Sequence, residues 1–138
     1  MSGLLLDTHV WLWYAEGVAD KLRMPEVKVL ESSRREGGLW VSAVSVWEIG
    51  VLQQKGRIQL SAPFRDWVQR ALDAPGIRFA PLGVAAAAES TLLPGEPHAD
   101  PADRFLIATA RVEGLALATR DDRILEYSRK GFVRSIAI

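Results

Sequence analysis

The sequence contains no cysteine, which excludes every site that depends on a thiol. A disulfide framework, a thiolate zinc site and a cysteine nucleophile are all ruled out. There is no excess of charge either, because 17 Lys and Arg residues balance 17 Asp and Glu residues. A strongly basic nucleic-acid-binding protein would have more cations than anions. Any contact with nucleic acid must therefore come from local basic patches, a metal ion or a second subunit.

Long apolar segments and targeting signals are also missing. No window approaches the roughly 18 uninterrupted apolar residues of a membrane span. The apolar start of the chain lacks a basic region, and Asp7 and His9 interrupt it early. The absence of cysteine fits a reducing compartment. We therefore expect a cytoplasmic protein with no membrane partner, folded as one domain over its 138 residues.

Short apolar runs alternate with helical patterns along the whole chain. The predicted strands are 3–6, 39–43, 77–82, 115–119 and 132–138. The predicted helices are about 7–17, 25–35, 44–55, 63–72, 84–93, 101–113 and 121 or 122 to about 129. This alternation predicts an α/β fold whose sheet is covered by helices on both faces. We expect a three-layer α/β/α sandwich with a short, mostly parallel sheet of four to five strands.

Three acidic residues lie where predicted strands turn into helices or where a helix begins. Asp7 follows the first strand, Asp121 follows the fourth strand, and Asp103 is in the first turn of the sixth helix. In open parallel sheets, ligands bind beyond the carboxyl ends of the strands. Each acid also has a structural explanation, since Asp at a helix start is a good N-cap and suits the helix dipole. Asp122 competes with Asp121 for the same place.

Glu48 is the acid whose structural explanation would cost most. It lies in the middle of a predicted helix, and its i−4, i+3 and i+4 neighbours are two valines and a leucine. No Lys or Arg stands three or four positions from it. A carboxylate on an apolar stripe costs several kcal/mol unless its charge is compensated. Glu48 could lie at the edge of the stripe, meet a distant Arg104 or Arg120, or face a divalent cation.

Together the four acids indicate a site for a divalent metal ion. Hard oxygen ligands without a majority of His or Cys suit Mg²⁺ or Mn²⁺ rather than zinc. Such an ion can activate a water for in-line attack on phosphorus and neutralise the developing charge. Asp7, Glu48, Asp103 and Asp121 could hold one ion or two. The sequence has no GxGxxG, P-loop or HExxH motif that would indicate other chemistry.

A few polar residues near the acids are candidates for contact with a substrate. These candidates are Thr8, His9, Arg104 and Thr119. A hydroxyl could instead bind a carboxylate, His9 could be structural, and Arg104 could be solvated surface charge. His98 precedes the sequence DPAD, where it could contact a substrate or simply lie in a loop.

Three segments of the chain resemble the PIN-domain family. They are a strand followed by DTHVWLW, then SAVSVWEIGVLQQKGRI, and then HADPADRFLIATARVEGLALATRDDRI. Within that family the chain resembles the VapC toxins of bacterial toxin–antitoxin pairs, and the likeness spans essentially the whole chain. It implies a single PIN-like domain over 1–138. It also implies an endoribonuclease that depends on Mg²⁺ or Mn²⁺ and acts as the toxin of a type II toxin–antitoxin system.

The resemblance also assigns roles to the acids and implies partners. Asp7 and Asp103 correspond to metal ligands, whereas Glu48 and Asp121 correspond to residues that support the metal or the attacking water. Asp122 remains the alternative to Asp121. The implied partners are RNA as substrate, a second copy of the chain in a homodimer, and a cognate VapB-like antitoxin that blocks the site.

Two other functions fit parts of the pattern. A catalytically silent PIN-like module would bind RNA or protein, but all four acidic positions are filled here. A phosphoacceptor receiver-like domain also gathers acids at strand ends. Such a domain usually has a Lys at the end of its last strand, where this chain offers only Arg134, and it has no role for Glu48.

Overall fold

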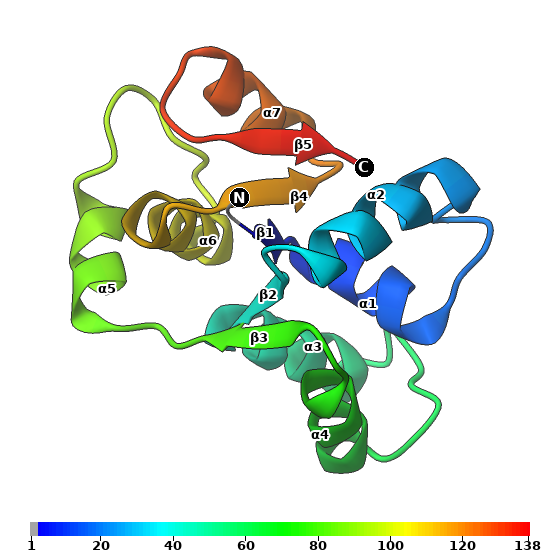
Figure 1. The fold of residues 1–138 in the computed structure, drawn as a ribbon. Helices are drawn as coiled ribbons and strands as arrows, with labels where there is room; N and C mark the ends of the chain where they lie inside the picture. The colour runs from blue at the N-terminus through cyan, green and yellow to red at the C-terminus, as the bar shows by residue number, and fades with distance from the viewer. Residues whose placement is uncertain (1–2) are drawn as a thin grey trace.

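The computed structural model describes residues 3–138, whose centre is a five-stranded sheet (Figure 1). The strands are β1 (Leu4–Leu6), β2 (Leu39–Ser42), β3 (Ile77–Ala80), β4 (Ala116–Thr119) and β5 (Ser135–Ala137). Their order is β3-β2-β1-β4-β5, and every neighbouring pair is parallel. Parallel neighbours need long crossover connections, which the helices between them supply. The predicted parallel sheet is confirmed.

Helices cover both faces of this sheet. They are α1 (Thr8–Glu16), α2 (Met24–Arg35), α3 (Ala43–Gln54), α4 (Phe64–Asp73), α5 (Val84–Thr91), α6 (Pro101–Glu113) and α7 (Asp122–Arg129). Leu4 and Leu6 pack into a core with α1, α2 and α4, whereas Leu5 packs into a second core with α6 and α7. Successive strand residues point to opposite faces, so the two cores lie on opposite sides of β1. The predicted three-layer α/β/α sandwich is confirmed.

Two strands are shorter than the apolar runs that predicted them. The run 77–82 forms a strand only to Ala80, because Pro81 has no N–H to donate to the sheet. The run 132–138 pairs only over Ser135–Ala137. Val133, just before that strand, is buried in the second core instead. Within residues 3–138, no helix has the length and apolar character needed to cross a bilayer.

The order of the strands places a topological switch point at β1 and β4. From β1 the chain builds β2 and β3 on one side, then crosses back to build β4 and β5 on the other (Figure 1). Leu6 pairs with Ala118, and the amide of Asp7 donates to the Ala118 carbonyl at 2.9 Å. Helices leave toward different faces at such a switch point and open a crevice beyond the strand ends. Residues that follow β1 and β4 are therefore brought together.

The core predicts how substitutions affect stability. Leu106 on α6 is fully buried, so Leu106→Ala should cost about 2–5 kcal/mol in the free energy of unfolding. Leu92 is 72% exposed, and Leu92→Ala should change that free energy by no more than about 0.5 kcal/mol. Denaturant unfolding of both variants tests this. Equal losses in the two variants would contradict the assignment of the second core.

Candidate active site

Four acidic side chains predicted from the sequence gather beyond the carboxyl ends of β1 and β4. Asp7 directly follows β1, and Asp121 lies two residues after β4. Asp103 is in the first turn of α6, and Glu48 is in the second turn of α3. The charges of Asp7, Asp121 and Glu48 all act on Asp103. The structure therefore brings these residues from four separate segments into one electrostatically coupled group.

The pKa values of the acids show how crowded the group is. Burial, followed by repulsion from Asp7, raises the pKa of Asp103 to about 8. Repulsion from Asp100, Asp121 and Glu48 adds to the effect. Burial is also the main reason why the pKa values of Asp7 and Glu48 are raised. Carboxylates that resist ionisation in this way are a favourable environment for a bound cation.

Thr119, the last residue of β4, joins Asp7 to Asp121. Its hydroxyl donates to Asp7 Oδ2 at 2.6 Å and accepts from the Asp121 amide at 3.0 Å. The Thr8 amide donates to the other oxygen of Asp7 at 2.8 Å. The hydrogen bond from Thr119 lowers the pKa of Asp7 and so opposes the effect of burial. These contacts fix the orientation of the Asp7 carboxylate.

Thr8 has the same relation to Glu48. Its hydroxyl donates to Glu48 Oε1 and lies 2.9 Å from the hydroxyl of Ser45. Because the single hydroxyl hydrogen of Thr8 points to Glu48, the Ser45 hydroxyl donates to Thr8 in turn. Thr8 is 2% exposed and Thr119 is fully buried. The structure thus places two of the predicted substrate-binding residues behind the acids, with their hydroxyls already engaged.

The two arginines considered as partners for Glu48 bind backbone carbonyls instead. Arg104 donates to the Ser90 carbonyl at the end of α5, and Arg120 donates to the Ile138 carbonyl at 2.7 Å. No ion pair formed by the described residues 3–138 joins a Lys or Arg to any of the four acids. Among these residues, therefore, no Lys or Arg side chain neutralises the negative charge of the group. His9, the remaining substrate candidate, is exposed beside Trp13, at a ring separation of 5.8 Å.

Asp121, rather than Asp122, faces the other acids. Its Oδ1 caps α7 by accepting from the amides of Arg123 and Ile124, at 2.8 and 3.2 Å. Its Oδ2 lies 3.5 Å from Nε2 of His98. Asp122 is exposed at the start of α7. Capping and the acid group therefore use different oxygens of one carboxylate.

His98 has a place in this group that the sequence did not reveal. Its Nε2 lies 3.1 Å from Asp103 Oδ2, and one ligand atom from each of His98, Asp103 and Asp121 fits within 4.8 Å of the others. The available signal was its position two residues before Asp100, the N-cap of α6. A side chain at that point can turn back toward the start of the helix. Periodicity does not show whether it does.

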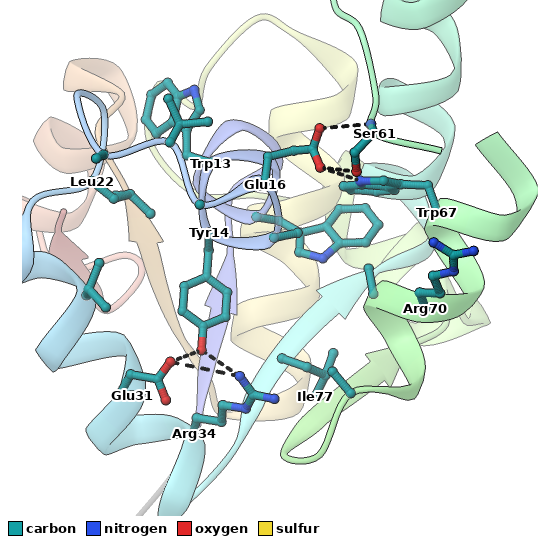
Figure 2. Close-up of a pocket in the computed structure, with 18 of the residues that line it drawn as sticks. Trp13, Tyr14, Glu16, Leu22, Glu31, Arg34, Ser61, Trp67, Arg70 and Ile77 are labelled. Carbon is teal, nitrogen blue, oxygen red and sulfur yellow. Dashed lines mark hydrogen bonds and ion pairs between the residues drawn. The ribbon is translucent and has the colours of Figure 1, made fainter. Parts of the chain in front are cut away.

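A groove of about 560 Å³ lies by the other end of α1, among α1, α2 and α4 (Figure 2). Its wall includes Leu22 and Trp67, which are both buried in the first core. At one edge, Arg34 donates to the hydroxyl of Tyr14 at 2.8 Å, and that hydroxyl donates to Glu31. The groove is mainly apolar with a polar edge, whereas the acid group is charged throughout. The groove and the acid group therefore differ in chemistry and lie by opposite ends of α1.

The fold and site have counterparts among known proteins. A family model described as "PIN domain" matches residues 4–130. The structure of VapBC2 from Rickettsia felis, bound to a DNA fragment from their promoter, superposes with a TM-score of 0.68 at 14% identity, covering 97% of each chain. A toxin–antitoxin complex from Klebsiella pneumoniae superposes with a TM-score of 0.59 at 19% identity, covering 86% of this chain and 87% of that one. At these identities the two structures show a shared fold.

Similarity in sequence identifies the group of PIN-domain proteins to which the chain belongs. Ribonuclease VapC22 of Mycobacterium tuberculosis (strain ATCC 25618 / H37Rv) is 34% identical over 124 residues, which cover 90% of this chain and 91% of that protein. The chain belongs to the PIN-domain family and, within it, to the VapC ribonucleases. The resemblance inferred from the acidic segments is confirmed.

The raised pKa of Asp103 predicts how the metal-free protein responds to pH. Between about pH 4 and the folded-state pKa, the unfolded chain has lost this proton and the folded chain keeps it. The free energy of unfolding therefore falls as pH rises through this window. Asp103→Asn should remove that loss, so its melting temperature in EDTA should exceed that of the wild type by several degrees at pH 8 and by less near pH 5.

Thermal unfolding at the two pH values tests this, with Asp122→Asn as the matched control. Asp122 carries the same charge on the exposed start of α7, so its substitution should not change the pH dependence. If Asp103→Asn were less stable than the wild type at pH 8, Asp103 would instead be held as a stabilising anion.

Proposed function

We propose that this chain is a metal-dependent endoribonuclease, the toxin of a type II toxin–antitoxin pair, which hydrolyses phosphodiester bonds in RNA. The observation that carries the proposal is the acid group at the switch point of the sheet. Its charges act on one another at Asp103, and none of the acids has a Lys or Arg partner among residues 3–138. Membership of the VapC ribonucleases supports it.

The donor set fits Mg²⁺ or Mn²⁺. Burial and mutual repulsion raise the pKa values of three carboxylates. A bound cation would stabilise the ionised form of these carboxylates. The Oδ2 atoms of Asp103 and Asp121 both lie near Nε2 of His98, at 3.1 and 3.5 Å, and ligand atoms gathered in this way could hold a metal ion. Oxygen ligands favour hard cations. Asp7 and Asp103 would hold the ion with support from Asp121 and Glu48, and the ion would supply activation of water and neutralisation of charge at phosphorus.

The protein's own residues prepare the site. Thr119 orients Asp7 and the backbone at Asp121 together, and Thr8 orients Glu48. Because the two threonines are buried, we propose that they act through the acids rather than on RNA. Glu48 is half-buried, and its hydrogen bond to Thr8 leaves its second oxygen free to take a proton from the attacking water.

RNA cleavage should require both a divalent ion and Asp7. Purified protein should cut total RNA with Mg²⁺ or Mn²⁺ and stop when EDTA is added. Asp7→Asn should reduce the rate by at least about 100-fold, because it removes one charge from the metal site. Asp122→Asn, the matched control on the exposed face, should cut at the rate of the wild type.

Mapping the 5′ ends of the fragments would also give the cleavage sequence. The silent-module alternative would be supported if folded, metal-loaded wild type left RNA intact. An Asp7→Asn variant that cuts at the wild-type rate would instead refute the assignment of the site.

A partner protein fits the apolar groove between α1, α2 and α4. We propose that the cognate antitoxin buries apolar side chains there, because a recess lined by Leu22 and Trp67 can accept them without charge. The complex named for the Klebsiella pneumoniae structure supports a partner of this kind. Residues of α1 line the groove, and the N-cap of the same helix is Asp7.

Binding of the antitoxin should depend on the groove. The probe is the purified cognate VapB-like antitoxin. Met24 lines the groove and is 64% exposed, so Met24→Glu should bury a charge against the antitoxin and weaken binding by at least about tenfold. Val84→Glu adds the same charge at an 88% exposed position outside the groove and should bind normally.

Calorimetry of each variant with this probe measures the affinity. Both variants should cut RNA like the wild type when the antitoxin is absent. Equal affinity of the Met24→Glu variant and the wild type would exclude the groove as the binding site.

A further inference from the structure

His98 lies in the connection between α5 and α6, and its side chain reaches into the acid group. That side chain is only 9% exposed, and its Nε2 faces the Oδ2 atoms of Asp103 and Asp121 at 3.1 and 3.5 Å. Two readings of this position are open. His98 could be a metal ligand alongside the two aspartates, or it could be a hydrogen-bond donor to them.

The other ring nitrogen distinguishes the two readings. Nδ1 of His98 lies 3.0 Å from the backbone nitrogen of Asp100, which donates to it. A backbone N–H can only donate, so Nδ1 accepts and carries no hydrogen. In the neutral ring the hydrogen is then on Nε2. Nε2, which lies 3.1 and 3.5 Å from carboxylate oxygens of Asp103 and Asp121, is therefore the ring nitrogen that carries the hydrogen.

A metal bond from Nε2 would disrupt this arrangement. A neutral imidazole that binds a metal through Nε2 carries its hydrogen on Nδ1. That hydrogen would point at the N–H of Asp100, so the present hydrogen bond would be lost and two donors would face each other. Asp100 is also the N-cap of α6, with its side chain accepting from Ala102 and Asp103. This backbone segment is therefore not free to turn away.

We propose that His98 is a positioning residue: its Nε2–H holds the carboxylates of Asp103 and Asp121 together for the metal, and it is not itself a ligand. The inference rests on the proposed function, since it concerns the same metal site. The two carboxylates come from different elements, α6 and the start of α7, and their like charges repel. One neutral donor shared between them lowers that repulsion without occupying all of their lone pairs.

A matched pair of variants tests the donor role. His98→Leu fills the space without a donor, whereas His98→Gln places an N–H at the same number of bonds from Cα. Loss of a hydrogen bond to a metal ligand weakens metal binding by about 10–100-fold. Titration with Mn²⁺, followed by the EPR signal of the free ion, should show at least a tenfold loss for His98→Leu. His98→Gln should stay within about threefold of the wild type.

Pulsed EPR of the Mn²⁺-loaded wild type tests, without any variant, whether His98 is a metal ligand. We expect no coupling from a directly bound nitrogen. A strong nitrogen coupling that disappears in His98→Gln would overturn the proposal. So would His98→Leu with wild-type affinity for Mn²⁺, or His98→Gln that binds no better than His98→Leu. Melting temperatures of the variants check that each is folded.

These outcomes separate the inference from the function on which it rests. A wild type that binds Mn²⁺ and cuts RNA, with an unaffected His98→Leu, would overturn only the role of His98. A wild type that binds no Mn²⁺ and leaves RNA intact would overturn the proposed function, and this inference with it.

Discussion

The parallel pairing of β1 with β4 is the constraint on which the site depends. Those strands are separated by more than 100 residues of sequence, yet the pair Leu6–Ala118 sets their ends side by side. The backbone alone therefore brings Asp7 and Asp121, which follow these strands, close together. The cost of this convergence is electrostatic, since burial and repulsion raise the pKa of Asp103 to about 8. The hydroxyls and the imidazole around the acids are best understood as responses to that cost.

On the proposed function, helix capping would not prevent Asp121 from binding a metal ion, because a carboxylate has two oxygens. Asp121 gives one oxygen to the amides at the start of α7 and turns the other toward His98. The first oxygen fixes the position of the second. A residue that caps a helix is therefore held more rigidly in a functional site than a residue with no structural role. An acid at a strand end can therefore cap a helix and still belong to a functional site.

The sequence predicted the layers, the strands and the four acids, because apolar periodicity and strand-end position determine these features. It also showed that Glu48 needs a partner, but the partner it meets, Thr8, is a hydroxyl and not one of the arginines considered. His98 could not be placed, since the loop before α6 has no periodicity and the position of its ring involves a hydrogen bond from the Asp100 amide. The end of β3 and the start of β5 also differ from the apolar runs, because Pro81 cannot donate to the sheet and Val133 is buried in the second core.

The zero net charge of the chain is consistent with a site for RNA when its distribution is considered. The acids that converge near Asp103 create a local negative field, and the nearby Arg120 is engaged by backbone carbonyls. A phosphodiester would be repelled from this field until a divalent cation neutralised it. On the proposed function, the ion is therefore needed for the substrate to approach as well as for its cleavage. A basic surface would attract RNA without an ion, whereas this arrangement makes binding at the acids conditional on the metal.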